Sequence, residues 1–166
     1  MGLKAASGCW RTVATYARGQ IVTLTGRIGV NSDGEKILSA DGVTQGGTNL
    51  LKPLTMPSRG VGGAAFNYDS VSGEGQAAVG GAVFGLNNVG LFVRTSGRVT
   101  AVDAPKSKFT ISGGSSPSPI EVWVPEGALP SVGQVAVVTG ASSCRKTDTG
   151  IVAVVRVAGP SDISVL

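Results

Sequence analysis

Apolar and polar residues alternate with a period of two along much of this chain, and that pattern predicts β-strands rather than helices. The alternation is densest after residue 91. Gly97 interrupts the first long run, and a residue without a Cβ lowers the cost of a sharp bend there. Residues 125–133 are expected to form a short helix or an irregular connection, and the polar residues 142–150 a hairpin loop. The strands expected in this half are 91–102, 108–112, 120–124, 134–141 and 151–158, with a short extended piece at 163–166.

Five strands, with a connector after the third and a long bent strand at the start, are typical of an OB-fold barrel. We therefore predict an all-β protein with a complete OB-fold-like five-stranded barrel at its C-terminus. The alternative is another small antiparallel sandwich or an SH3-like barrel. The side chains expected in the barrel core, at these positions or their immediate neighbours, are Val93, Val99, Ile111, Val122, Val135, Val137, Ile151 and Val155.

One short phrase occurs twice, as GQIVTLTG at 19–26 and as GQVAVVTG at 133–140. The offset of 114 residues continues past the phrase, where Ile37 aligns with Ile151 and Val43 with Val157. Such self-similarity indicates a repeated supersecondary unit. The second copy follows a full set of strands and the first follows almost none. We predict a partial OB-like β module at 1–43, a Gly/Pro-rich ordered arm at 44–90 and the complete barrel at 91–166. The strands expected in the partial module are Leu3–Ala6, Gln20–Val30 and Lys36–Val43.

The predicted arm belongs to a segment, residues 42–97, that holds half of the 26 glycines and shows no hydrophobic period. Flexible linkers usually lack apolar anchors. This segment carries several, and we expect it to be ordered and to cross its own barrel or a neighbouring subunit. Those anchors are Leu50, Leu51, Leu54, Met56, Phe66 and Val83.

Composition argues against enzymatic chemistry. The chain has no histidine, which removes Ser-His-Asp and Cys-His arrangements, and its two cysteines cannot form a Cys₄ zinc site. Glu121 and Glu126 are expected to be solvated charges at a strand end. No Gly-rich stretch matches a phosphate-binding loop. We therefore expect no enzyme activity, no cofactor and no metal site. A net charge of +4, spread along the chain, is typical of a solubilising surface.

Three stretches resemble OB-like modules of large secreted or cell-surface bacterial proteins. They are GLNNVGLFVRTSGRVTAVD at 85–103, VTGASSC at 138–144 and the segment 156–163, and LKPL at 51–54 resembles the connector between such modules. These modules are functionally uncharacterised, so the resemblance implies an extracellular or cell-surface location and no known activity. By the same likeness, the chain begins near the third strand of its first module. Its first residues show no export signal, and no stretch has the roughly 20 apolar residues that a membrane span needs.

A barrel that lacks strands exposes sheet edges, which are templates for pairing with another chain. The first hypothesis is an extracellular structural protein that assembles with itself into a filament or other homopolymer by β-strand complementation. Head-to-tail repetition of such a contact is heterologous and open-ended. The apolar residues expected to need cover from a neighbour are Leu3, Ile21, Leu24, Ile28, Ile37 and Leu38.

The second hypothesis is a monomeric OB-fold module that binds single-stranded nucleic acid or a surface polysaccharide. Such modules stack bases on aromatic side chains above a basic groove. Phe109, which lies beside Lys108 and near Lys106, is the position with this chemistry. Phe92 and Trp123 are expected in the core.

Cys9 and Cys144 both lie in predicted loops, where they are plausible ends of one disulfide within or between chains. In a reducing compartment they would instead be thiols or small buried side chains.

Overall fold

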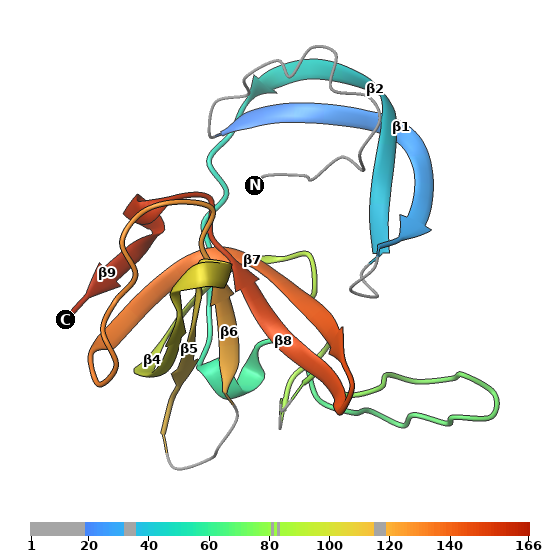
Figure 1. Ribbon diagram of the computed structural model, residues 1–166. Coiled ribbons are helices and arrows are strands. Elements are labelled where there is room, and N and C mark those ends of the chain that lie inside the picture. Colours follow the sequence, from blue (N-terminus) through green and yellow to red (C-terminus); the bar gives the residue numbers. More distant parts are fainter. Residues whose placement is uncertain (1–18, 32–35, 81, 83, 115–118) are drawn as a thin grey trace.

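A computed structural model describes residues 19–31, 36–80, 82, 84–114 and 119–166, and the predicted all-β class is confirmed (Figure 1). Besides strands, these residues form three single-turn 3₁₀ helices. No helix in the described ranges has the length and apolar character needed to cross a membrane. The elements are β1 (Gln20–Val30), β2 (Lys36–Thr48), β3 (Leu54–Thr55), η1 (Ser58–Gly60), β4 (Phe92–Asp103), η2 (Ala104–Lys106), β5 (Lys108–Ser112), β6 (Ile120–Trp123), β7 (Val135–Thr147), β8 (Gly150–Arg156), η3 (Pro160–Asp162) and β9 (Ile163–Val165).

Five strands close into a hydrogen-bonded ring in the order β4-β5-β6-β8-β7, and β7 returns to pair with β4. Every pairing in this ring is antiparallel except that of β6 with β8. The strand β9 extends the β8 side of β7, and β3 adds a short parallel pairing to β4. A closed ring of five strands is therefore present between Phe92 and Arg156, and these strands fall close to their predicted places.

The long strand β4 changes partner along its length. Its first half pairs with β7 from Phe92 to Arg98, and its second half pairs with β5 from Arg98 onward. Gly97 lies at this change of partner, where a Cβ would come 2.8 Å from the Ser112 carbonyl oxygen. The glycine expected to bend this strand thus allows β5 to approach its backbone closely.

The core contains most of the predicted residues. Val93, Val99, Ile111, Val122 and Val155 are all at most 1% exposed. In β7 the core residues are the immediate neighbours of the predicted ones, which the prediction also allowed.

In β7, Ala136 and Val138 are buried, while Val135 and Val137 are only half-buried. The run VAVV offers an apolar residue on both faces, so alternation alone could not choose between them. Ile151 is 47% exposed because it lies one residue beyond Gly150, at the turn end of the β7–β8 hairpin.

That hairpin is longer than predicted. Residues 142–150 were expected to be a polar loop, but β7 continues to Thr147 and pairs with β8 as far as Gly150. The correction has a simple cause: Ser and Thr side chains are compatible with strands when backbone pairing continues. Residues 125–133 form an irregular connection without a helix, and Leu129 packs against the core.

The described part of the arm after β3 crosses its own barrel. Val61 is 1% exposed within the core cluster and Met56 packs against that cluster. Asn88 holds the arm: its Nδ2 donates to the Gly60 carbonyl at 2.7 Å, and its Oδ1 accepts from the Gly62 N–H at 2.8 Å. The Ser142 hydroxyl donates to the same Oδ1 from β7 at 2.9 Å. The loop between Phe66 and Gln76 projects away from the barrel (Figure 1).

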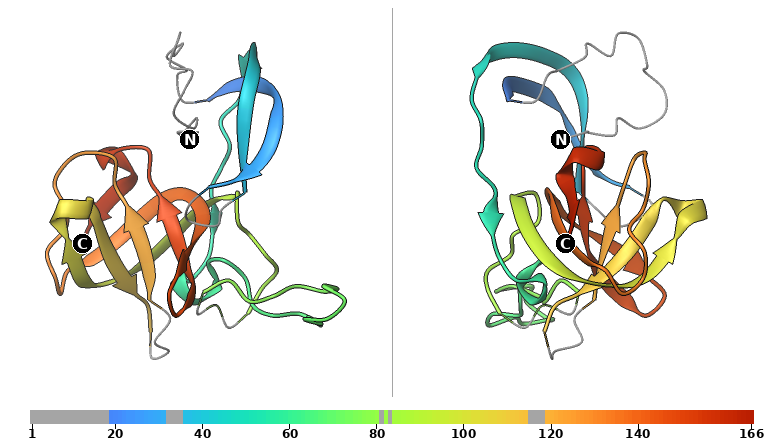
Figure 2. Two further views of the ribbon diagram at one scale, coloured as in Figure 1. Left: turned by 45° about the vertical axis from the view of Figure 1, so that its right-hand side comes forward. Right: turned by 90° about the vertical axis from the view of Figure 1, so that its left-hand side faces the viewer.

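The strands β1 and β2 form a separate two-stranded antiparallel sheet, which we call the ribbon (residues 20–30 and 36–48). Figure 1 and the left view of Figure 2 show the ribbon above the barrel, beyond the linker 49–53. β2 runs to Thr48, five residues past the predicted boundary at Val43. The predicted strand at Leu3–Ala6 lies outside the described residues.

Candidate functional site

The ribbon presents an apolar face that no described element covers. Ile28 is 80% exposed, Val30 66% and Val43 44%, while Leu24 is half-buried. Leu24, Ile28 and Val30 are spaced by even numbers along β1, so they lie on one face of the sheet. Val43 lies directly opposite Leu24, and the face therefore extends across both strands.

The predicted contact residues fall on both faces of this ribbon. Ile21 is 48% exposed and lies at an odd position, on the face opposite Leu24 and Ile28. Ile37 and Leu38, in β2, are half-buried. Leu3 lies outside the described residues. The structure thus places Leu24, Ile28 and Leu38 on one face, and Ile21 and Ile37 on the other.

The ribbon also has two strand edges with no partner strand among the described elements. β1 has 11 residues and β2 has 13, so each edge is long. Unpaired backbone N–H and C=O groups along such an edge are a ready template for another strand.

Exposed apolar side chains are concentrated in the N-terminal half of the described chain. Fourteen of the nineteen exposed large hydrophobic residues precede Phe92, on the ribbon, the linker and the arm. Apolar surface gathered in this way marks interaction sites. The barrel, by contrast, has little of it.

A charged and aromatic cluster lies on the outer surface of the barrel, and it was not predicted. Glu121 on β6 accepts hydrogen bonds from Lys108 Nζ at 2.8 Å and from Arg145 Nη2 at 2.7 Å. The Trp123 indole N–H donates to the other carboxylate oxygen at 2.8 Å. Arg156 places its guanidinium 4.5 Å from the centre of a Trp123 ring.

Burial would raise the pKa of Glu121, but the hydrogen bonds from Arg145, Lys108 and Trp123 outweigh it and lower the pKa to about 2. Glu121 is therefore ionised at neutral pH. Its side chain is only 13% exposed, so the expectation of a solvated edge charge was wrong for this residue. Because Glu121, Lys108 and Arg145 lie on β6, β5 and β7, the cluster ties three strands together.

The structure does not assemble the predicted polyanion contact. Phe109 is 1% exposed and belongs to the core, so it cannot stack on a base. Lys108 pairs with Glu121, and Lys106 pairs with Asp103 at 3.5 Å. Phe92 and Trp123, both expected in the core, are instead half-buried, and Trp123 lies on the outer surface. Alternation in β5 and β6 carried this signal, since Lys108 and Thr110 flank Phe109 while Glu121 and Trp123 flank Val122.

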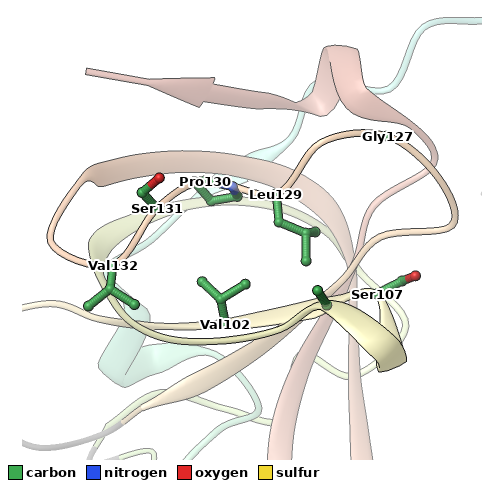
Figure 3. Close-up of a pocket in the computed structure, with 8 residues that line it drawn as sticks. Val102, Ser107, Gly127, Leu129, Pro130, Ser131 and Val132 are labelled. Carbon is green, nitrogen blue, oxygen red and sulfur yellow. The ribbon is translucent and has the colours of Figure 1, made fainter.

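An open hollow of about 530 Å³ lies at the end of the barrel, between the β4–β5 turn and the connection after β6 (Figure 3). Val102, Leu129 and Val132 line it, and Figure 3 shows their side chains directed toward this space. None of its eight lining residues is acidic or basic. The hollow therefore offers no acid, base or charged group for catalysis.

Cys144 lies in β7, opposite Ala153 of β8, and not in the predicted loop. It is half-buried. Cys9 lies outside the described residues, so the disulfide stays a prediction. Within the described ranges, no group of three His, Cys, Asp or Glu residues could hold a metal ion.

Comparison with models of known protein families, and with curated protein sequences, finds no match for this chain.

Proposed function

We propose that this chain is a non-enzymatic structural protein that assembles with itself through the ribbon, by addition of strands between neighbouring subunits. The observation that carries the proposal is the ribbon's combination of long open edges with an uncovered apolar face. A two-stranded sheet is only marginally stable alone in water. Strands or an apolar face from a neighbour would satisfy the backbone groups and cover Ile28, Val30 and Val43.

The barrel fits this role as a rigid body that the ribbon links. We propose that it is an OB-like module, which its strand order supports, and that the protein acts outside the cell or at the cell surface. The 114-residue repeat supports a common origin for the ribbon and the β7–β8 hairpin. The assembly proposed is a filament or another homopolymer.

The alternative, a monomeric module for nucleic acid or polysaccharide, has less support. Its named aromatic, Phe109, is buried. The half-buried aromatic on the outer surface, Trp123, has Arg156 over its ring and Glu121 beside it. Salt-sensitive binding of single-stranded DNA or an anionic polysaccharide by a monomer would favour this alternative.

The test compares the mass of the full chain in solution with that of two triple variants. The ribbon variant carries Ile28→Lys, Val30→Lys and Val43→Lys. The control carries Val102→Lys, Val132→Lys and Ile151→Lys, three barrel residues of 38–62% exposure. Light scattering and electron microscopy should show large assemblies for the wild type and the control, and much smaller species for the ribbon variant. A compact monomer of wild-type protein at high concentration would refute the proposal.

A further inference from the structure

We infer that β1 pairs antiparallel with β1 of a second copy of this chain, from Ile21 to Arg27, about a two-fold axis at Leu24. The inference rests on the proposed self-assembly and names the partner and the register. It comes from two likenesses of β1 to barrel strands, which converge on the same seven residues.

The first likeness is to β7, at the 114-residue offset. In the barrel, β7 pairs with β4 from Val135 to Ala141. Ala141 is opposite Phe92 of β4 and also opposite Arg156 of β8, so the two partners occupy opposite edges of β7. In the ribbon, β2 occupies the edge of β1 that corresponds to the edge of β7 shared by β8 and β9. The other edge of β1, over residues 21–27, is therefore the one that β4 would fill.

The second likeness is to β4 itself, at an offset of 71 residues. β1 reads VTLTGRI from Val22, and β4 reads VRTSGRV from Val93. The two segments share the valine, the Gly-Arg pair, a hydroxyl residue before it and a β-branched residue after it. β4 pairs with β7 from Phe92 to Arg98, on the edge opposite β5. Subtracting the offset gives residues 21–27 again.

β1 therefore carries the pattern of both strands in the β4–β7 pairing, and two copies of β1 can reproduce that pairing. The barrel pair Thr95–Val138 corresponds, in the proposed contact, to Leu24 of one copy opposite Leu24 of the other. Phe92 opposite Ala141 becomes Ile21 opposite Arg27. The pairing is unchanged when the two copies are exchanged, so the contact is isologous.

The faces of the strands agree with this register. Thr95 and Val138 are both buried and face the barrel interior. Their counterpart, Leu24, lies on the apolar face of the ribbon with Ile28. A slip of one residue would put the two copies' apolar side chains on opposite faces, and the joined sheet would lose its single apolar face.

The contact joins two ribbons into a four-stranded sheet, in the order β2-β1-β1-β2. It keeps the two Arg27 side chains apart, because each lies opposite Ile21. The outer edges of the new sheet belong to β2, and growth beyond a dimer would use them.

Cysteine cross-linking tests the two-fold axis in full-length protein with Cys9→Ser and Cys144→Ser. Leu24→Cys should form a disulfide-linked dimer under mild oxidation, because directly opposed residues bring their Cβ atoms within about 5 Å. Ile28→Cys is the matched control on the same face. In this register the two copies of residue 28 lie roughly 27 Å apart, so they should not cross-link.

A mixing experiment tests the register. Thr23 of one copy should lie opposite Thr25 of the other. Oxidising a mixture of Thr23→Cys and Thr25→Cys chains should therefore give more dimer than oxidising either alone.

Association constants separate this inference from the proposed function. Leu24→Lys puts like charges opposite each other, and should raise the dimer dissociation constant about tenfold or more. Thr44→Lys on β2 should leave it unchanged. If the Leu24→Lys chain still assembles and Leu24→Cys forms no cross-link, the two-fold contact is contradicted. The proposed self-assembly is not contradicted by that result. A monomer at every concentration would overturn both.

Discussion

Glu121 occupies a position where one carboxylate serves three neighbouring strands. Lys108 and Arg145, with side chains 16% and 23% exposed, both direct their charge at it. If the carboxylate is lost, two partly buried cations remain without it. Removing one ion from such a buried cluster lowers the free energy of unfolding by more than the intact cluster adds to it.

We predict that Glu121→Gln lowers the free energy of unfolding at pH 7 by about 1.5–3 kcal/mol, the range for hydrogen bonds to charged groups. The pKa of Glu121 is about 2 in the folded protein and near the ordinary 4.5 in the unfolded chain. A lowered folded-state pKa stabilises the fold above pH 4.5, and that stabilisation is lost as the pH falls toward 2.

Chemical denaturation at several pH values measures this effect. The difference between wild type and Glu121→Gln should be constant at neutral pH and shrink below pH 4.5. Glu126→Gln, an exposed residue in the connection after β6, is the control and should change little at any pH. A difference that stays constant down to pH 2 would contradict the assigned role.

Alternation in β5 and β6 was the local signal for which aromatic side chain faces inward. Phe109 and Trp123 both lie in alternating strands, and the basic neighbours of Phe109 suggested exposure. In β5, Lys108 points outward because its neighbour Phe109 points inward. The strand positions were predictable because they depend on local alternation, whereas the Glu121 cluster requires knowing which strands become neighbours.

At the scale of elements, the arm and the barrel depend on each other. Asn88 is 6% exposed and joins Gly60, Gly62 and Ser142 through three hydrogen bonds. Of the anchors predicted for the arm, Met56 packs on the core. The others in the described chain are exposed, namely Leu50, Leu51, Leu54 and Phe66, and Val83 lies outside the described residues. Asn88 carried no signal in the sequence, because its partners are 26 to 54 residues away.

We predict that Asn88→Ala destabilises the protein by about 1–3 kcal/mol for each buried backbone group left without its partner. The adjacent Asn87→Ala is the control, since Asn87 is exposed and bonds locally to the Val89 N–H. Thermal unfolding should separate the two variants by several degrees. Equal melting temperatures would show that the arm is not held by Asn88.

The change of partner in β4 gives a second prediction at this scale. Gly97→Val should destabilise the barrel strongly, because its Cβ would meet the Ser112 backbone, which cannot move aside as a flexible side chain can. Overpacking of this kind costs about 1–3 kcal/mol or more. Ser96→Val, on the exposed outer face of the same strand, is the control. Urea denaturation that gives equal midpoints for both variants would contradict this reading of Gly97.

At the scale of the whole molecule, the chain divides into a barrel with a packed core and a ribbon without one. The 114-residue repeat showed in the sequence that β1 resembles β7. It did not reveal that β2 would extend to Thr48 and pair with the whole length of β1, because no period marks residues 44–48. The sequence also left open whether the arm packs on its own barrel or on a neighbouring subunit. The answer depends on contacts such as that of Val61 with the core, and no local pattern predicts such contacts.

Every residue of the core cluster lies at or after Met56, so the barrel does not draw on the ribbon for its core. We predict that deleting residues 1–48 leaves the barrel's unfolding free energy within about 0.5 kcal/mol of the full chain, as for changes away from the core. Deleting residues 1–62 also removes β3, Met56 and Val61, and should cost about 2–5 kcal/mol, the range for large core deletions.

Denaturation of both truncated chains, with light scattering in parallel, gives stability and assembly in one experiment. The 1–48 deletion should be as stable as the barrel in the full chain and should no longer associate, because the open edges and apolar face of the ribbon are gone. Association that persists in this folded, shortened chain would place the self-contact on the arm or the barrel instead. Loss of folding on deleting residues 1–48 would mean that the ribbon supports the barrel, contrary to the composition of its core.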